Sequence, residues 1–366
     1  MIIQVVTQMP VYGVKSGLCD GEQQKQEILD RFREGIHMNE KKREYEINWP
    51  HVILVGAIAV VLVLIGVVIG VNIGARNKSK PVPVTGSGYT WSLQPGAEAQ
   101  MIYANFWQFA KASYVLVGDI PNCEFYKIVK EVPRNDFQTD NFSIDEGDES
   151  TRMYYHADDG SKLSELAVDV SSYQSALDWV ALKQAGVTIA FIRAGYRGYG
   201  AEGKLVTDEM FQTHIEAAKA AGMKVGIYFY SQALNYDEGV AEAQYALNLV
   251  REYALDMPVA IDTEEVYADG ARTADLTNDA RTDGVVGFCE TVKNAGYTPM
   301  IYSNRNWFVQ KLDMTRLGSY KLWLAHYANQ PDFPYLYSGW QYTGTGKISG
   351  IDQDLDLNVW MEGSVY

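Results

Sequence analysis

Beyond about residue 165, short apolar runs alternate with longer amphipathic segments. The apolar runs are rich in Val and Ile, as is typical of strands buried on both faces of a parallel sheet. The amphipathic segments have the spacing of helices that pack on such a sheet. Strands are predicted over residues 166–170, 187–192, 225–230, 258–261, 298–303, 321–325, 339–342 and 355–359, and helices over 176–185, 207–221, 237–253 and 278–295.

Eight strand-like runs favour an α/β fold with a closed (β/α)8-like barrel, irregular in outline and either round or flattened. A doubly wound open sheet is the alternative. Within the second predicted helix, Thr207 is the expected N-cap and Gly222 the expected stop. In both architectures, functional side chains gather where the parallel strands end.

A second pattern lies near the N-terminus, where residues 52–71 are all Val, Ile, Leu, Ala or Gly. Twenty helical residues span about 30 Å, the thickness of a bilayer core, and exceed the apolar region of a signal peptide. A retained single transmembrane helix is therefore expected. Gly66, Gly70 and Gly74 are spaced by four residues, a weak indication that two such helices pair.

These patterns divide the chain into five regions. Lys and Arg flank the apolar run on both sides, so charge alone does not orient it. Met38 is a second candidate translation start, which would make residues 1–37 an extension. The expected regions are an N-terminal segment (1–50), the transmembrane helix (51–75), a Pro- and Ser-containing linker (76–88), a stalk or small accessory module of unread function (89–160) and a catalytic domain (161–366).

Composition narrows the classes of function. The net charge of −15 disfavours a nucleic-acid partner. Three widely separated cysteines indicate neither a disulfide framework nor a zinc knuckle, and the last 200 residues contain only His214 and His326, too few for a multi-histidine zinc site. No metal or cofactor is expected. The 12% of aromatic residues fits either sugar-stacking surfaces or an aromatic-rich core.

Carboxylates follow several of the predicted strands. Asp262 and Glu264 lie two residues apart, so their side chains share one face of a strand with Cα atoms about 6.5 Å apart. Glycoside hydrolysis needs one carboxylic acid that protonates the leaving oxygen and a second group that stabilises the cation-like transition state. Clustered carboxylates raise one another's pKa, which keeps one protonated. Glu264 has the longer reach and suits the acid, and Asp262 suits charge stabilisation.

From about residue 166 to residue 360 the sequence resembles glycoside hydrolase family 25, the lysozyme-like muramidases. No single segment is specific, but seven in the same order are, and the C-terminal stretch around Asp356 also fits. The segments include Asp169-Val170-Ser171, Phe191-Ile192-Arg193-Ala194, Tyr228-Phe229-Tyr230-Ser231, Ile261-Asp262-Thr263-Glu264, Tyr302-Ser303-Asn304, Trp323-Leu324-Ala325-His326-Tyr327, Trp340-Gln341-Tyr342 and Asp354-Leu355-Asp356-Leu357-Asn358.

The resemblance implies roles for individual residues. Glu264 corresponds to the catalytic acid and Asp262 to its partner, while Asp169 and Asp356 correspond to two further acids of the cleft. Asp356 is preferred to Asp352 because it lies in the Asp-Leu-Asn stretch. The residues expected to contact sugar are Arg193, Tyr196, Tyr228, Tyr230, Tyr302, Trp323, Tyr327 and Trp340.

The implied activity is cleavage of the β-1,4 bond between N-acetylmuramic acid and N-acetylglucosamine in peptidoglycan, without a metal. Two mechanisms stay open: attack by the substrate's own acetamido oxygen with Asp262 orienting it, or activation of a water by Asp262. Because peptidoglycan lies outside the cell, the N-terminus is expected in the cytoplasm and the catalytic domain outside a bacterial membrane. The alternative function is a catalytically weak wall-binding scaffold for a surface or secretion machine. A chitinase-like enzyme is disfavoured because the longer D-x-x-D-x-D-x-E motif is missing.

Overall fold

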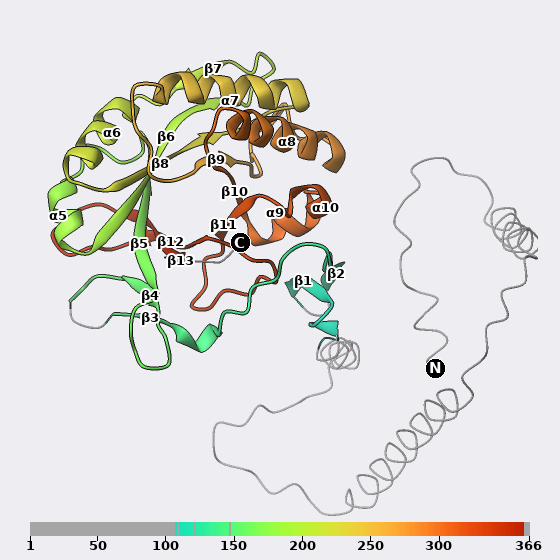
Figure 1. The fold of residues 1–366 in the computed structure, drawn as a ribbon. Coiled ribbons are helices and arrows are strands. Elements are labelled where there is room, and N and C mark those ends of the chain that lie inside the picture. The colour runs from blue at the N-terminus through green and yellow to red at the C-terminus, as the bar shows by residue number, and fades with distance from the viewer. Residues whose placement is uncertain (1–106, 108–109, 120–121, 146–147, 362–366) are drawn as a thin grey trace, which may run out of the picture. The chain divides into compact units, whose positions relative to one another are not determined.

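The computed structural model describes residues 107, 110–119, 122–145 and 148–361 (Figure 1). All of them belong to one of two compact units of the chain, Ser92–Tyr366. The predicted N-terminal segment, transmembrane helix and linker lie outside the described residues. Among the residues that are described, no helix has both the length and the apolar character needed to cross a bilayer.

Eight strands close into a barrel, which confirms the predicted architecture. Seven neighbouring strands run parallel, whereas the last strand is antiparallel to both of its neighbours. Direct pairing between the first two barrel strands completes the closure. In order around the barrel, the strands are β5 (Ser164–Val170), β6 (Val187–Arg197), β8 (Lys224–Tyr230), β9 (Val259–Asp262), β10 (Pro299–Asn304), β11 (Lys321–Ala325), β12 (Gly339–Gly346) and β13 (Leu355–Met361).

Among the described residues, helices follow only the first five barrel strands, so the structure departs from a full eightfold repeat (Figure 1). The β11–β12 connection contains Pro331 and Pro334, which lack the amide hydrogen that a helix interior needs. The connection between β12 and β13 is a short polar turn. The helices of the barrel are α5 (Trp179–Gln184), α6 (Phe211–Ala220), α7 (Tyr236–Val250), α8 (Asn278–Asn294), α9 (Arg305–Gln310) and α10 (Met314–Leu317).

The predicted helix cap at Thr207 is wrong. Thr207 ends the short strand β7 (Leu205–Thr207), which pairs antiparallel with β6, and its hydroxyl hydrogen bonds to Tyr245 at 2.8 Å. The carboxylate of Asp208 instead accepts a hydrogen bond from the amide of Met210 at the start of α6. A side chain that extends the sheet edge is unavailable to cap the following helix, so the helix begins later than its polar pattern suggests.

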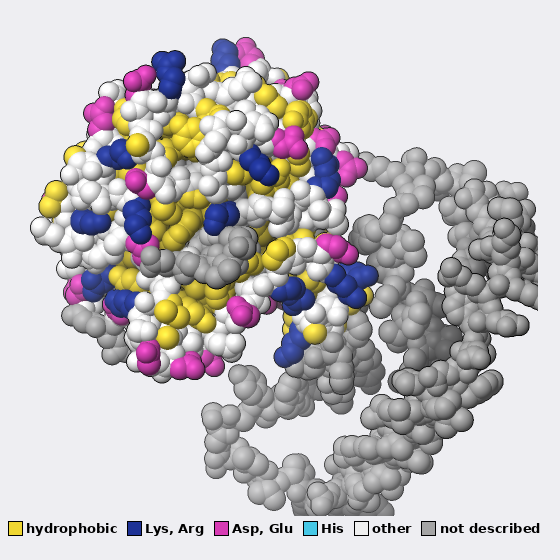
Figure 2. Space-filling view, in the orientation of Figure 1, with side chains coloured by type: hydrophobic (Ala, Val, Ile, Leu, Met, Phe, Trp, Pro, Cys, Tyr) yellow, Lys and Arg dark blue, Asp and Glu magenta, His cyan; other side chains and the backbone are white. Residues whose placement is uncertain are grey.

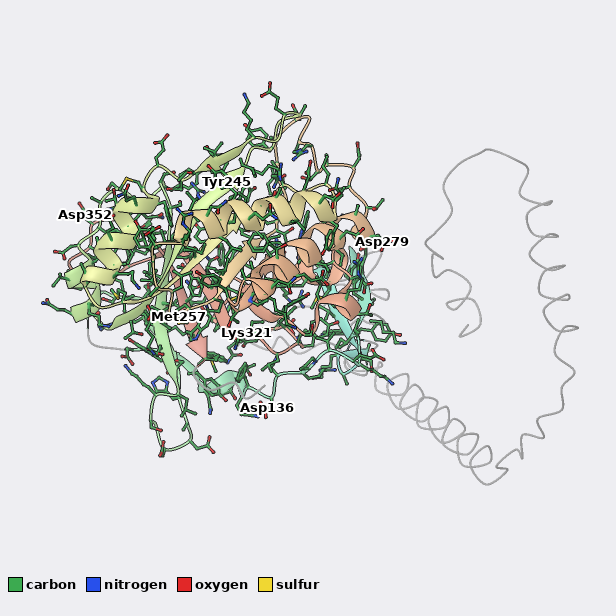
Figure 3. All side chains as sticks on the ribbon, turned by 45° about the horizontal axis from the view of Figure 1, so that its top comes forward. Asp136, Tyr245, Met257, Asp279, Lys321 and Asp352 are labelled. Carbon is green, nitrogen blue, oxygen red and sulfur yellow. The ribbon has the colours of Figure 1, made fainter. Side chains whose placement is uncertain are left out.

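Helices α7 and α8 lie side by side on the barrel (Figures 1 and 3). Their backbones approach closely because glycines line the contact. A Cβ atom on Gly239 would lie 1.9 Å from the carbonyl oxygen of Gly284, and one on Gly287 would lie 2.3 Å from that of Tyr236. Larger side chains at these positions would force the helices apart and open the core beneath them.

Two apolar clusters flank the barrel wall because successive strand side chains face opposite ways. The outer cluster joins the strands to helix residues such as Leu182, Ile215 and Phe288. The inner cluster comes only from barrel strands and fills the interior. Its buried members are Ala167, Ile189, Phe191, Tyr228, Ala260, Met300, Tyr302, Trp323, Ala325 and Trp360.

The described part of the predicted stalk region packs on the barrel. It contains two hairpins, β1 (Tyr114–Asp119) with β2 (Asn122–Lys127) and β3 (Phe142–Ile144) with β4 (Met153–Tyr155), and the 3-10 helix η1 (Thr139–Asn141). Asn135 donates from Nδ2 to the carbonyl oxygens of Phe333 and Tyr335 at 2.6 and 3.0 Å. The ring of Phe142 lies edge-on to Trp340, with centroids 5.0 Å apart.

On the face shown in Figure 2, the described Lys and Arg side chains are interspersed with Asp and Glu instead of gathering in one basic patch. The described part of this face thus carries charges of both signs.

Candidate active site at the carboxyl ends of the barrel strands

The structure brings the four predicted acids together at one rim of the barrel. Asp169 and Asp262 each lie two residues beyond an alanine of the inner cluster, so their side chains face the barrel axis at the strand ends. Asp356 reaches the same rim by the opposite route. Because β13 is antiparallel, its beginning lies beside the end of β5, and Asp356 is directly opposite Asp169.

Asp262 and Glu264 form a hydrogen-bonded carboxyl pair. Burial raises the pKa of Asp262 well above its usual range, and the charge of Glu264 raises it further. Burial also raises the pKa of Glu264, while the hydrogen bond to Asp262 lowers it. The two groups therefore titrate as an interacting pair, in which the hydrogen bond favours protonation of Asp262 over Glu264.

The other oxygen of Asp262 is free to accept a hydrogen bond. Asp262 is only 4% exposed, and its Oδ1 atom is buried without a partner among the described residues. An unsatisfied buried carboxylate oxygen is costly unless a ligand completes its hydrogen bonds. This atom is the place in the site where a donor on a bound molecule would gain most.

Asp169 is held by two side-chain amides. Gln341 donates from Nε2 to both carboxylate oxygens at 3.1 and 2.9 Å, and Asn358 donates from Nδ2 to Oδ2 at 2.8 Å. The indole Nε1 of Trp323 donates to Oδ1 of Asn358 at 2.6 Å, which fixes the orientation of that amide. Burial and the charge of Asp356 nevertheless raise the pKa of Asp169 well above its usual range.

Gln341 connects this acid to the tyrosines of the rim. Its Oε1 atom accepts hydrogen bonds from the hydroxyls of Tyr302 at 2.8 Å and Tyr327 at 2.9 Å. With Nε2 directed at Asp169, every polar atom of the Gln341 side chain is engaged. Tyr302 is 9% exposed and Tyr327 63% exposed, so the network extends from the barrel interior to solvent.

Asp356 completes the acidic cluster. Burial raises its pKa to about 7, and the charge of Glu264 contributes to the increase. The pKa of Tyr228 is also raised well above its usual range, mainly by burial and then by the charge of Asp169. The four carboxyl groups thus lie close enough to titrate as one interacting set.

Arg193 supplies the positive charge at this rim. Its Nε atom lies 2.7 Å from Oδ2 of Asp208, and Nη2 donates to the hydroxyl of Ser172 at 3.0 Å. The guanidinium carbon lies over the rings of Tyr173 and Tyr196, at 5.1 and 5.5 Å from their centroids. Its charge lowers the pKa of Asp262, opposing the effect of burial.

The predicted sugar contacts separate into three groups. Tyr196, Tyr230 and Tyr327 are partly or largely exposed, whereas Tyr228 and Tyr302 are nearly buried beside the acids. Trp323 is 1% exposed and lies inside the barrel, with its ring centroid 4.7 Å from that of Tyr302.

The structure does not bring Trp340 to this rim. It is fully buried in the outer cluster, and its Nε1 atom donates to the carbonyl oxygen of His326 at 2.8 Å. The reason is the alternation of β12: the neighbouring Gln341 faces the acids, so Trp340 must face away. Gln341 is the side chain of this segment that the site uses.

Sequence reasoning missed several residues of the site. Gln341 and Asn358 stand within the matching segments, and strand alternation was a usable signal for Asn358, which lies two residues from Asp356 and therefore shares its face of the strand. Tyr173 and Tyr267 lie in loops after β5 and β9 and are 86% and 91% exposed. Periodicity carries no information about such loops, so only the contrast between large aromatic side chains and irregular polar segments could have singled them out.

Comparison with known proteins identifies the family. The model for glycosyl hydrolases family 25 matches residues 168–351, about half of the chain. The autolytic lysozyme of Clostridium acetobutylicum is 29% identical over 197 residues, covering 54% of this chain and 56% of the relative. Lysozyme M1 of Streptomyces globisporus is 26% identical over 206 residues, covering 52% of this chain and 66% of the relative. The chain thus spans between about half and two thirds of these relatives' length.

A solved structure shows the same fold. The modular autolysin LytC from Streptococcus pneumoniae, in complex with a synthetic peptidoglycan ligand, superposes with a TM-score of 0.50 at 21% identity. The match covers 68% of this chain and 61% of the autolysin. The family model and the lysozyme relatives place this barrel among the glycoside hydrolases. The chain belongs to glycosyl hydrolase family 25, which confirms the family expected from its sequence segments.

Proposed function

We propose that this protein hydrolyses the β-1,4 bond between N-acetylmuramic acid and N-acetylglucosamine in peptidoglycan. The observation that carries the proposal is the buried Asp262–Glu264 pair, two hydrogen-bonded carboxyl groups with raised pKa values at the rim of a family 25 barrel. The lysozymes among its relatives support the same substrate class.

Glu264 is the proposed general acid. Its carboxyl group is less buried than that of Asp262 and follows the end of β9, where a glycan in the cleft can meet it. It donates its proton to the glycosidic oxygen as the bond from that oxygen to the anomeric carbon breaks. The same group then removes a proton from the water that completes hydrolysis.

Asp262 is the proposed partner in a substrate-assisted reaction. The acetamido N–H of the bound sugar donates to the unpartnered Oδ1 atom of Asp262, and the acetamido oxygen attacks the anomeric carbon. This contact favours the ionised form of Asp262, so the proton of the pair moves to Glu264, where bond cleavage needs it. Carboxyl groups in hydrogen-bond contact are closer than the separation of about 6.5–9.5 Å that suits direct attack by water.

The proposed activity is tested by digesting purified peptidoglycan with the full-length chain and determining the released ends by mass spectrometry. Reducing muramic acid ends are the expected product. Reducing glucosamine ends would retain the acid pair but assign a different bond. No release of fragments by the folded protein would favour the wall-binding scaffold instead.

We further propose that residues 51–75 form a single transmembrane helix that tethers the enzyme to a bacterial cell membrane. The unbroken apolar run of residues 52–71 supports this proposal, and the location of peptidoglycan sets the direction, with the N-terminus in the cytoplasm. Close packing through Gly66, Gly70 and Gly74 would allow two helices to pair. The glycan strands are the partner outside the membrane.

Protease added to intact protoplasts is expected to remove the catalytic domain, because the proposed topology exposes it on the outer surface. The measurement is immunoblotting with antibodies against the C-terminal domain, before and after detergent lysis. A cytoplasmic protein in the same sample should resist until lysis. Protection of the domain until the membrane is dissolved would contradict the proposed orientation.

A further inference from the structure

The connection from β9 to α8, residues 263–277, carries Glu264 at its beginning and the exposed Tyr267 beyond it. The Tyr267 hydroxyl is close to acids: a hydrogen bond to Glu265, followed by the charges of Glu265 and Glu264, raises its pKa. The ring is 91% exposed and stands three residues beyond Glu264 in the chain, so its faces are open to a sugar that reaches the acid. An irregular loop of this length adopts one position only if other contacts hold it.

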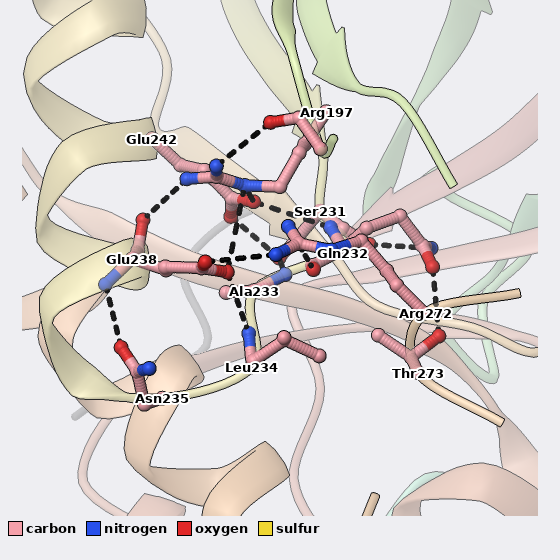
Figure 4. A network of polar contacts seen from close by, with 11 residues as sticks. Arg197, Ser231, Gln232, Ala233, Leu234, Asn235, Glu238, Glu242, Arg272 and Thr273 are labelled. Carbon is pink, nitrogen blue, oxygen red and sulfur yellow. Dashed lines mark hydrogen bonds and ion pairs between the residues drawn. The ribbon is translucent and has the colours of Figure 1, made fainter. Parts of the chain in front are cut away.

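Arg272 provides such contacts from the far end of the loop (Figure 4). Its Nη2 atom donates to Oε1 of Glu238 at 2.8 Å, and Nη1 donates to the carbonyl oxygen of Gln232 at 3.2 Å. Its backbone amide donates to the carbonyl oxygen of Tyr199 at 2.9 Å. The adjacent Thr273 donates to Oε1 of Gln232 at 2.8 Å. The Arg272 side chain is only 8% exposed.

A buried ion pair secures the partners of Arg272. Nε of Arg197 lies 2.6 Å from Oε1 of Glu242, and Ser231 and the amide of Gln232 also donate to this carboxylate. The same arginine donates to the carbonyl oxygen of Glu238 at 3.1 Å. Figure 4 shows how these side chains meet between α7 and the loop that precedes it.

The β6–β7 turn lies against the same guanidinium. Arg197 donates to the carbonyl oxygen of Gly203 at 3.0 Å, and a Cβ atom on Gly203 would lie 2.2 Å from Nη1 of Arg272. Gly203 also has φ of +54°, which glycine adopts readily. Three rim segments, after β6, β8 and β9, therefore meet at Arg272.

These buried charged contacts are better suited to holding the loop in one position than to stabilising the fold. Replacing a buried ion pair by apolar side chains of similar volume is often neutral or stabilising, because desolvating the charges costs as much as their attraction returns. What charged, directional contacts add is one defined geometry. The hydrogen bonds of the Arg272 side chain go to Glu238 and Gln232, not to the acids, so its effect on a substrate must pass through the loop.

We infer that Arg272 is a positioning residue that holds loop 263–277 so that Tyr267 forms a sugar-binding wall beside Glu264. The inference rests on the proposed function, since a glycan is the molecule that the wall would contact. It names Tyr267 as a substrate-binding residue and Arg272 as the residue that makes Tyr267 effective.

The test compares Arg272→Met, Tyr267→Ala and the double variant in full-length protein digesting peptidoglycan. Each single change is expected to raise KM about tenfold, equivalent to about 1.4 kcal/mol, with kcat within about twofold of the wild type. The KM of the double variant should be no higher than that of the single variant with the higher KM, because both changes remove the same contact with the sugar. Arg272→Lys should recover part of the loss. Multiplied effects in the double variant, or an unchanged KM for Arg272→Met, would overturn the inference.

Arg316→Met is the matched control, because Arg316 forms an exposed ion pair with Asp283 at 2.6 Å on a different part of the barrel. It should leave KM unchanged. If Arg272→Met does not fold, Glu238→Gln replaces it, with an expected rise in KM of about threefold from loss of the charge on the acceptor. A wild-type KM for Glu238→Gln would reject the positioning role of Arg272.

Hydrogen exchange separates this inference from the proposed function. Without substrate, amides of residues 263–277 should exchange faster in Arg272→Met than in the wild type or in Arg316→Met. Equal exchange in all three proteins would reject the positioning role even if the wild type digests peptidoglycan. If residues 263–277 exchange faster in Arg272→Met but the wild type does not digest peptidoglycan, the positioning role of Arg272 stands and the proposed activity is rejected.

Discussion

Glu264→Gln is expected to lower kcat on peptidoglycan by about 10³-fold or more while leaving glycan binding in place. Glutamine has nearly the shape of glutamic acid and can still donate a hydrogen bond, but it has no proton to transfer to the glycosidic oxygen. General acid catalysis alone typically contributes about 10²–10⁴-fold. The measurement is the rate at which reducing ends are released. Binding of the variant to glycan chains and its thermal unfolding are measured on the same preparation.

Glu252→Gln is the matched control, because Glu252 pairs with Arg251 on the surface and is 80% exposed. It should turn over like the wild type. Turnover by Glu264→Gln above a tenth of the wild-type rate would remove Glu264 from the role of acid. Loss of binding together with turnover would indicate a structural role instead.

The pH profile provides a second readout for Glu264. Burial raises its pKa, and the reaction needs the protonated form. Activity should therefore persist below this raised pKa and fall as the pH rises through it. The residual activity of Glu264→Gln should lack that alkaline decline, since the group whose proton is lost has been removed. Because the acids interact, the observed pKa belongs to the set of four carboxyl groups.

The barrel was predictable because its strands are nearly continuous apolar runs. In a strand that is buried on both faces, successive residues are apolar, and such runs are easily recognised in a sequence. All eight predicted ranges overlap barrel strands. The direction of the last strand was not predictable from its composition. Asp356 nevertheless reaches the expected rim, because the antiparallel β13 begins where the parallel strands end.

Within the site, residue type was more predictable than side-chain direction. Asp169 and Asp262 lie at strand ends and Glu264 follows one, and that placement alone put them at the rim. Trp340 and Gln341 show the limit of this reasoning. Trp340 was expected to contact sugar, but the pleat of the strand turns Gln341 toward the acids and Trp340 away from them. The contacts of Arg272 depend on three segments far apart in sequence, so no local pattern reports them.

Asp262→Asn is expected to lower kcat by about 10²–10³-fold with a smaller effect on KM. Asparagine keeps the shape of the side chain but loses the negative charge that the proposed mechanism places beside the acetamido group. The loss should be large because Asp262 is buried, where a single charge interacts more strongly than in water. Initial rates over a range of glycan concentrations separate kcat from KM.

Asp352→Asn is the matched control for Asp262→Asn. Asp352 is exposed in the turn before β13 (Figure 3), so the same change of charge there should leave kcat unaltered. A similar loss in both variants would indicate a general effect of net charge. An effect of Asp262→Asn on KM alone would assign Asp262 to binding and not to the chemical step.

The configuration of the first product distinguishes the two roles open to Asp262. Attack by the acetamido oxygen followed by water inverts the anomeric carbon twice, so the wild type should release the β-anomer of the new reducing end first. Direct attack by a water that Asp262 activates inverts once and gives the α-anomer. Proton NMR during the first minutes of digestion resolves the two. Because the hydrogen-bonded Asp262–Glu264 pair leaves no space for a water between the carboxyl groups, we expect retention.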